Sequence, residues 1–291
     1  MNAGTPGIRD RLFVGMQYLL PQHLLSRMMH ALARSRIRPL KNLVIRGFLR
    51  FYAINLAEAS QPDALAYESF NAFFTRALKP GVRPIDTAPG AVVSPVDGEV
   101  SQAGRIERDM LLQAKGIHYS IGELLGSDDE LARQFDGGYF ATIYLAPFDY
   151  HRIHMPLAGR LRCARHVKGD LFSVNAVTAA SVPGLFARNE RVACLFDTDA
   201  GPMAVVLVGA LFVGSMSLTW TGELPSYRGR LPRELPIGDP PIALDKAAEL
   251  GQFNMGSTVI LLFPAGRTIP HPGLLPGASV RLGERIATLA P

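Results

Sequence analysis

The stretch Met203-Ala-Val-Val-Leu-Val-Gly-Ala-Leu-Phe-Val-Gly214 is the longest apolar run of the chain, at 12 residues. A helix that spans a bilayer needs roughly 18–20 apolar residues, so this run is too short to cross a membrane. It instead predicts a buried strand pair or one long core strand. A β-rich core is therefore expected around it.

Short β-type runs separated by Gly and Pro extend this pattern from Ala91 onward. The strands expected with it are Tyr139–Leu145, Arg191–Phe196, Ala204–Val208, Thr258–Phe263 and Arg285–Leu289. Helices are expected at Ile121–Leu125 and Glu130–Gln134. The 28 Gly and 22 Pro residues fit many turns between short strands. The fold class predicted is α+β, with a mainly β body of sandwich or barrel type and an N-terminal amphipathic helical region.

The composition of the 291 residues supports a sizeable core: 48% are hydrophobic and 19% are charged. These values exclude wholesale disorder. Only two cysteines occur, Cys163 and Cys194, without a metal-type pairing. A disulfide framework is therefore not expected, and a reducing, cytoplasmic compartment is favoured.

The positive charge of the chain is concentrated at its N-terminus. Residues 1–50 hold nine Lys and Arg against one acid, Asp10, which gives +8, whereas the whole chain carries +5. A nucleic-acid reader usually spreads its basic residues over a folded face, so no nucleic-acid partner is expected. A basic arm that is rich in Leu, Met and Phe suits an anionic membrane surface better.

Residues 7–70, which include most of this basic arm, are expected to be helical. Apolar residues recur at helix spacing from Leu24 to Leu32, and Pro21 and Pro39 divide the segment into short helices. We expect residues 1–70 to associate with a membrane and residues 71–291 to form the catalytic domain. A helical cap packed on the core is the alternative. The N-terminus lacks a signal-peptide pattern, so a protein that lies on a membrane without crossing it is predicted.

Three segments place reactive side chains at turns. They are Ser94–Val100, which contains Asp97; Pro147–Pro156, which contains His151 and His154; and Phe253–Ile260, where Ser257 follows Gly256. The two histidines lack a third ligand at a recognisable spacing, so no metal site is expected. Ser257 does not lie in the G-x-S-x-G elbow of hydrolases, because position 259 is Val. Each segment alone is typical of an ordinary turn.

Together the three segments hold the parts of a nucleophilic triad. An Asp can orient a His, and the His can take the proton of a Ser hydroxyl. Because Gly256 leaves its carbonyl unhindered, Ser257 can attack the peptide bond that precedes it. Such a reaction is intramolecular and needs only a strained turn and a base.

From about Phe70 to the C-terminus the chain resembles the phosphatidylserine decarboxylase proenzymes, pyruvoyl-dependent enzymes of phosphatidylethanolamine synthesis. The motifs that carry the resemblance are, in order, Phe73–Pro84, Ser94–Gly98, Lys115-Gly116 with Tyr119-Ser120, Asp149–Pro156, Asn175–Val177, Gly184–Arg191 and Gly256–Thr258. Each motif is weak singly, and their joint order is specific.

The resemblance implies a self-cleaving precursor. It assigns the cleavage triad to Asp97, His154 and Ser257, and decarboxylation to His151. Cleavage between Gly256 and Ser257 would give a β chain, 1–256, and an α chain, 257–291, with a covalent pyruvoyl group derived from Ser257. That group would form a Schiff base with phosphatidylserine and release CO₂, without a metal or a diffusible cofactor.

The resemblance also implies where the protein works and what it contacts. Ser173 and Phe172 lie in a segment similar to the one that lines the substrate site of the family, and Ser173 is a candidate for the lipid phosphate. The expected partners are phosphatidylserine and an anionic membrane surface, and a dimer of αβ units is expected. The location expected is the cytoplasmic side of the cell membrane, as a peripheral protein.

Three alternatives remain open from the residues. A serine hydrolase would use the same Asp/His/Ser set on an external ester and would keep the chain intact. A non-catalytic carrier-like domain of the biotinyl or lipoyl kind would need a lysine on an exposed hairpin, usually beside Met, and the sequence has no such motif. A peripheral membrane-binding protein without chemistry would tolerate changes in the triad.

Overall fold

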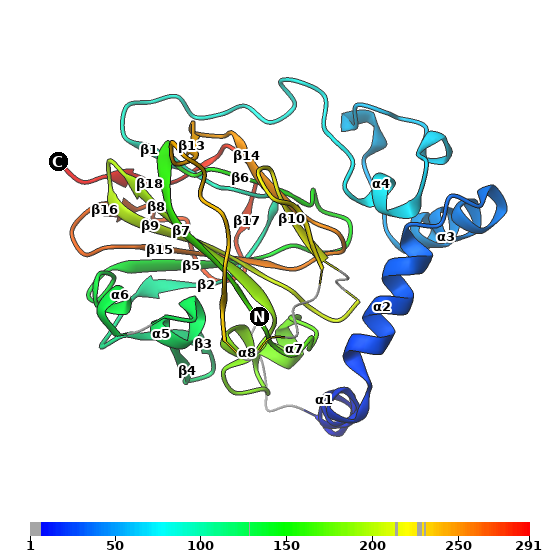
Figure 1. The fold of residues 1–291 in the computed structure, drawn as a ribbon, viewed down its shortest axis with the longest axis horizontal. Helices are drawn as coiled ribbons and strands as arrows, with labels where there is room; N and C mark the ends of the chain where they lie inside the picture. Colours follow the sequence, from blue (N-terminus) through cyan, green and yellow to red (C-terminus); the bar gives the residue numbers. More distant parts are fainter. Residues whose placement is uncertain (1–6, 128, 213–214, 226–228, 230) are drawn as a thin grey trace.

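Strands form the body of the protein, and helices flank it, in the computed structural model (Figure 1). The structure describes residues 7–127, 129–212, 215–225, 229 and 231–291. Its central layer is a nine-stranded sheet, counted over those residues. Two smaller sheets cover one face of this layer, and short helices with a β-hairpin cover the other. The α+β prediction is confirmed.

The central sheet is antiparallel at every strand pair among the described residues. Its order is β12 (Arg233–Glu234), β7 (Gly159–Val167), β8 (Arg191–Thr198), β9 (Gly201–Val208), β15 (Thr258–Phe263), β5 (Tyr139–Tyr144), β2 (Gly98–Arg105) and β17 (Ser279–Val280), while β13 (Ala243–Leu244) pairs with β7. The two most apolar strands, β9 and β15, lie side by side at its centre.

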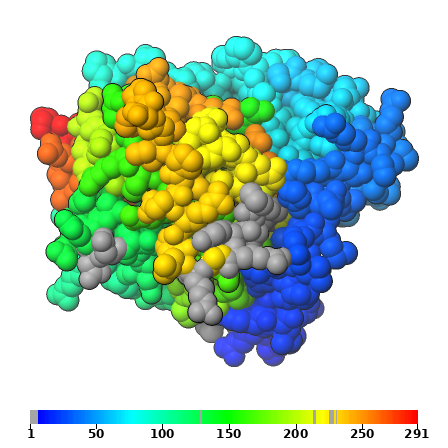
Figure 2. Space-filling model, viewed as in Figure 1, coloured from blue at the N-terminus to red at the C-terminus, as the bar shows by residue number. Residues whose placement is uncertain are grey.

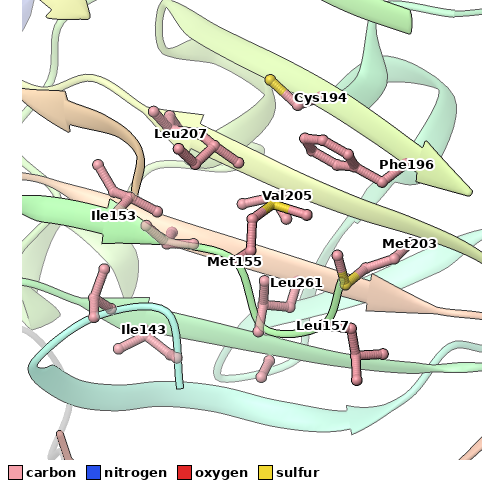
Figure 3. Close-up of a cluster of buried hydrophobic side chains, with 14 of the residues drawn as sticks. Ile143, Ile153, Met155, Leu157, Cys194, Phe196, Met203, Val205, Leu207 and Leu261 are labelled. Atoms are coloured by element: carbon pink, nitrogen blue, oxygen red, sulfur yellow. The ribbon is translucent and has the colours of Figure 1, made fainter. Parts of the chain in front are cut away.

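Strands β9 and β15 are apolar at nearly every position because both of their faces are buried. Alternate side chains point to opposite faces of a strand. Val205, Leu207 and Leu261 therefore belong to one core, with Ile153 and Met155 of the next layer, as Figure 3 shows. The intervening residues of both strands belong to a second core on the other face.

The smaller elements complete the two outer layers. On one face lie a four-stranded sheet of β11 (Gly222–Pro225), β10 (Ser215–Leu218), β14 (Glu249–Phe253) and β6 (Arg152–His154), and a three-stranded sheet of β1 (Ala91–Val93), β18 (Arg285–Leu289) and β16 (Thr268–Pro270). On the other lie the hairpin β3 (Met110–Ala114) and β4 (Ile117–Ser120), with α5 (Ile121–Leu125), α6 (Asp129–Arg133), α7 (Ala176–Ala179) and α8 (Leu185–Arg188).

The predicted strands and short helices are confirmed to within a few residues, but the described residues of the run from Met203 to Gly214 form neither one long strand nor a strand pair. Strand β9 ends at Val208. The Gly209 N–H makes a last bond in register with β8, to the Glu190 carbonyl at 2.8 Å, and the Gly209 carbonyl accepts the Asn189 side chain at 2.9 Å. The next strand, β10, begins only at Ser215. Residues 213 and 214 of the run lie outside the described part of the chain.

The N-terminal region forms three helices, α1 (Ile8–Leu19), α2 (Gln22–Ala33) and α3 (Arg38–Phe51), along one side of the body (Figures 1 and 2). The division at Pro21 and Pro39 is confirmed: Pro21 is the N-cap of α2, and Pro39 lies in the first turn of α3, where no amide donor is needed. The helical prediction for residues 52–69 is wrong apart from two short 3₁₀ turns, Leu56–Glu58 and Ala64–Ala66. A short helix α4 (Phe70–Phe74) follows, and its aromatic side chains pack with Phe48 of α3. Within the described residues, no helix is long and apolar enough to cross a membrane.

Candidate active site

The turn that carries Gly256 and Ser257 links strands of two different sheets. Strand β14 belongs to the four-stranded sheet, and β15 lies in the centre of the large one. Before the turn, Asn254 is buried and donates its side-chain N–H groups to the hydroxyls of Ser215 and Ser217, both at 2.9 Å. After it, the Ser257 carbonyl accepts the Leu145 N–H at 2.8 Å. The turn is thus held at both ends, and Gly256 lies between them.

His151 lies directly beside this turn. Its ring is completely buried and packs against the Phe74 ring, with 4.0 Å between the centroids. Its Nδ1 donates to the Asp149 carbonyl at 2.9 Å, so Nε2 carries the lone pair. A β-carbon added at Gly256 would lie 3.0 Å from that Nε2. Burial lowers the pKa of His151 to about 3, and the charge of Arg76 acts in the same direction, so the ring is neutral.

The Ser257 hydroxyl has no hydrogen-bond partner among the described residues, and neither does Nε2 of His151, although both atoms are buried. Buried polar atoms usually have partners, and exceptions are common at reactive sites. The structure therefore brings an unpaired hydroxyl and an unpaired imidazole nitrogen to Gly256.

His154 makes two hydrogen bonds of its own. Its Nδ1 donates to the Ala247 carbonyl at 2.8 Å, and Nε2 lies 3.3 Å from the Tyr150 hydroxyl. Burial lowers the pKa of His154, while the Ala247 hydrogen bond and the charges of Glu249 and Asp97 oppose that decrease. The imidazole is therefore held in the tautomer that leaves Nε2 as the acceptor.

Asp97 is bound by an arginine instead of by a histidine. The Arg83 guanidinium reaches both carboxylate oxygens, with Nε at 3.0 Å from each and Nη2 at 2.6 Å from Oδ2. The Leu282 N–H adds a bond of 2.9 Å to Oδ1. The expectation that Asp97 fixes the tautomer of His154 by a direct bond is not met in the described residues, because Arg83 occupies the carboxylate and the Ala247 carbonyl occupies Nδ1. Asp97 acts on His154 through its charge.

A cavity of about 330 Å³ lies next to the turn. Its lining is mainly apolar and comes from the helical region and from four segments of the body: Phe48, Tyr52, Phe74, Tyr144, Leu145, Pro147, Ser173, Val174, Asn175, Ala210, Leu211, Phe212, Met255 and Gly256. Ser173 lines this cavity, and its hydroxyl lies 2.7 Å from that of Thr178. Phe172 is not among the lining residues. It is buried against Tyr18, with 4.8 Å between the ring centroids.

Comparison with known proteins decides the family. The family model for phosphatidylserine decarboxylase matches residues 70–288, and a further model, described as PSD, matches residues 12–53. The chain belongs to the phosphatidylserine decarboxylase family. Similar relatives are each named phosphatidylserine decarboxylase proenzyme. Those from Marinobacter nauticus and Azotobacter vinelandii are 53% identical over 281 residues, and one from Delftia acidovorans is 54% identical over 280 residues. Each alignment covers 96% of this chain and 98% of the relative.

Three residues of the site make contacts that the sequence does not predict. Arg83 holds Asp97, Tyr150 contacts His154, and Asn254 anchors the turn. Arg83 and Tyr150 stand inside motifs that carry the family resemblance, but no local pattern shows which partner each side chain meets. Among the described residues, no group of three or more His, Cys, Asp or Glu side chains is placed to hold a metal ion.

Asp149, beside His151, makes a pH-dependent contribution to stability. Its carboxylate accepts the Ala146 N–H at 2.7 Å, yet burial raises the pKa of Asp149 from 3.8 to about 6, and the charge of Asp97 acts in the same direction. Between these values the folded state binds more protons than the unfolded chain. The stabilising contribution of the protonated carboxyl is therefore lost as the pH rises from about 4 to 6.

Asp149→Asn should remove this pH dependence, because an amide oxygen can accept the same N–H without ionising. We expect the Tm of the variant to exceed that of the parent by roughly 2–4 °C at pH 8 and to match it at pH 4, in a Ser257→Ala background that excludes chain cleavage. Differential scanning calorimetry at the two pH values measures this. An equal effect at both values contradicts the raised pKa.

Proposed function

We propose that this protein is a self-processing phosphatidylserine decarboxylase, which converts phosphatidylserine to phosphatidylethanolamine and CO₂ with a pyruvoyl group formed at position 257. One observation carries the proposal: Gly256 lies between a buried Ser257 hydroxyl that has no partner among the described residues and the buried His151 imidazole, beside an apolar cavity. The name proenzyme of the relatives supports the processing step. A serine hydrolase is less well supported, because it would keep its chain intact, whereas the relatives are named proenzymes.

In the cleavage step, the Ser257 hydroxyl attacks the Gly256 carbonyl and converts the peptide bond to an ester. Elimination of the Gly256 carboxylate then leaves dehydroalanine at position 257. Its hydrolysis releases ammonia and leaves a pyruvoyl group at the start of the α chain, 257–291. The site fits this chemistry: the hydroxyl has no competing hydrogen bond among the described residues, and Gly256 leaves its carbonyl without a side chain that would hinder attack.

The pyruvoyl group would supply an electrophilic carbonyl that bonds the substrate amine and accepts the electron pair left by CO₂. The residues of this chain then have two tasks. The cavity beside Met255 and Gly256 takes the lipid, and Ser173 remains a candidate contact for its phosphate. Phe172 is buried against Tyr18 and does not line this cavity, so the lipid contact predicted for it is not part of the proposal.

The two histidines suit different steps. A general base works best when its pKa lies near the working pH. Burial lowers the pKa of both histidines. At His154 the charges of Glu249 and Asp97 oppose this decrease while that of Arg152 adds to it, whereas at His151 the charge of Arg76 adds to it. We therefore assign proton removal from Ser257 to His154, with Asp97 acting through its field. His151, whose Nε2 faces Gly256, is assigned to decarboxylation at position 257.

The helices α1 and α2 would bring this site to a membrane. Ile8, Leu12, Met16 and Leu19 recur along one face of α1, and between 58% and 86% of each is exposed. Leu24 and Met28 continue an exposed apolar face on α2. Arg9, Arg11 and Arg27 are also exposed. An exposed apolar stripe flanked by cations is typical of helices that lie in the membrane interface.

Replacing Leu12 and Met16 together by Asp should weaken docking on anionic vesicles, because two carboxylates would enter the interface. Sedimentation with phosphatidylglycerol vesicles should fall at least about fivefold, while chain cleavage stays complete. Ile269→Asp with Leu275→Asp is the matched control, since both residues are exposed and apolar but lie on the body. Equal sedimentation of the two variants would show that α1 does not dock.

Charge reversal at Arg34 or Arg36 is a poorer test of docking. Arg34 pairs with Glu223 at 2.6 Å, and Arg36 pairs with Glu68 at 3.1 Å. His30 also reaches Glu223, at 2.8 Å. Reversal at Arg34 would therefore loosen α2 from β11 as well as change the surface charge. Arg9 and Arg11 are better positions for a charge-reversal test.

The activity is tested by CO₂ release from phosphatidylserine labelled in its carboxyl group, with phosphatidylcholine vesicles alone as the blank. Release should coincide with the appearance of two chains in the intact mass spectrum. A protein that is fully cleaved but releases no CO₂ would refute the substrate assignment. The dimer of αβ units belongs to the same proposal, and light scattering of the cleaved protein tests it.

A further inference from the structure

Helices α1 and α2 direct buried polar side chains toward the body of the protein. Gln17 is 2% exposed and Ser26 is 3% exposed, and Gln22 lies between them in the sequence, half-buried. The inward face of an amphipathic helix is normally apolar. A buried polar side chain on that face must find hydrogen-bond partners, and the identity of those partners indicates its purpose.

All three side chains accept backbone N–H groups of the body. Gln17 Oε1 accepts the Ser173 N–H at 2.8 Å, and Gln22 Oε1 accepts the Leu171 N–H at 2.7 Å. Ser26 Oγ accepts the Phe212 N–H at 3.2 Å. The helices are therefore joined to two separate loops, one at residues 171–173 and one at residue 212.

These two loops are walls of the cavity beside Gly256, because Ser173 and Phe212 both line it. Thr178, which is completely buried, adds to the contact between Gln17 and Ser173. Its hydroxyl accepts a hydrogen bond from Gln17 Nε2 at 3.4 Å and lies 2.7 Å from the Ser173 hydroxyl. Phe212 has a φ of 69°, a strained backbone conformation for a residue other than Gly. Such conformations persist where surrounding contacts hold them, and they are frequent at ligand sites.

We propose that Gln17, Gln22 and Ser26 are positioning residues of the substrate cavity, which hold its two walls against the helices whose opposite faces dock on the membrane. This inference rests on the proposed function, since it takes the cavity as the lipid site. It predicts that loss of these bonds weakens substrate binding while chain cleavage and membrane docking are retained.

Ser26→Val and Ser26→Thr form a matched pair, because both add one methyl-sized group and only Thr keeps the acceptor oxygen. With a short-chain phosphatidylserine that stays monomeric in solution, Ser26→Val should raise KM about tenfold and leave kcat within about twofold, whereas Ser26→Thr should remain near wild type. Gln17→Met, which keeps the side-chain length without its polar atoms, should also raise KM. All three variants should be cleaved completely and sediment with anionic vesicles like wild type.

A binding measurement separates this inference from the proposed function. In a Ser257→Ala background, calorimetry gives the Kd for the same short-chain lipid without any turnover, and Ser26→Val should raise it about tenfold over Ser26→Thr. Equal Kd values, with Gln17→Met also equal to its parent, would overturn the inference whether or not the protein decarboxylates. A difference in Kd together with no CO₂ release from wild type would uphold the positioning role and refute the activity.

Discussion

Ser257→Ala should leave the protein as a single chain of 291 residues without decarboxylase activity. The hydroxyl is the proposed nucleophile, and Ala offers no atom that can attack the Gly256 carbonyl. Without cleavage no pyruvoyl group forms, so both readouts should be lost together. Intact mass spectrometry under denaturing conditions reads the first, and CO₂ release from phosphatidylserine reads the second.

Ser257→Cys is the control for this experiment. It keeps a nucleophile of similar size at the same position, so some cleavage should be restored. Restoration would show that the loss in Ser257→Ala comes from the missing nucleophile and not from a disturbed turn. A clean Ser257→Ala sample that still divides between residues 256 and 257 would refute the self-attack mechanism.

Replacing the two histidines by Gln should separate cleavage from decarboxylation. His154→Gln should remain uncleaved, because it removes the histidine whose basicity the charges of Glu249 and Asp97 support. His151→Gln should be cleaved but should lose about 10²–10⁴-fold in decarboxylation rate, the usual contribution of a positioned proton-transfer group. Intact mass and CO₂ release are measured on the same samples.

His271→Gln is the control for the loss of a histidine as such, because His271 is exposed and lies away from the turn. The reverse outcome, with His151→Gln uncleaved and His154→Gln mature, would exchange the two assignments. The position of His151 Nε2 against Gly256 makes this a real alternative, since the base would then be the nearer imidazole.

Local sequence patterns determined most of the secondary structure. The bounds expected for Thr258–Phe263, Arg285–Leu289 and Ile121–Leu125 match β15, β18 and α5. These elements are short, consist mostly of apolar residues and are bounded by turn residues. The prediction for the run from Met203 to Gly214 was wrong because hydropathy alone does not indicate where a strand ends. At the end of β9 the carbonyl of Gly209 accepts the side-chain N–H of Asn189 at 2.9 Å, a contact made by tertiary packing.

The sequence also indicated the reactive residues of the candidate site, but it did not indicate which residues contact them. Asp97, His154 and Ser257 suggested a linear triad, because residue types indicate chemistry without giving distances. The contacts of Asp97 with Arg83 and Leu282 arise from the packing of segments far apart in the chain. No rule based on sequence spacing predicts which donor forms a hydrogen bond with a given carboxylate.

What the sequence by itself determined is therefore the order of the strands along the chain, the basic amphipathic N-terminus and the reactive residues at Gly256-Ser257. These features depend on side-chain periodicity and residue type, which are local. Only the tertiary structure decided that the turn bridges two sheets, that His151 lies against it, and that Gln17 and Ser26 hold the cavity walls. Each of these depends on segments far apart along the chain, and the common burial of strand faces and helix faces brings them together.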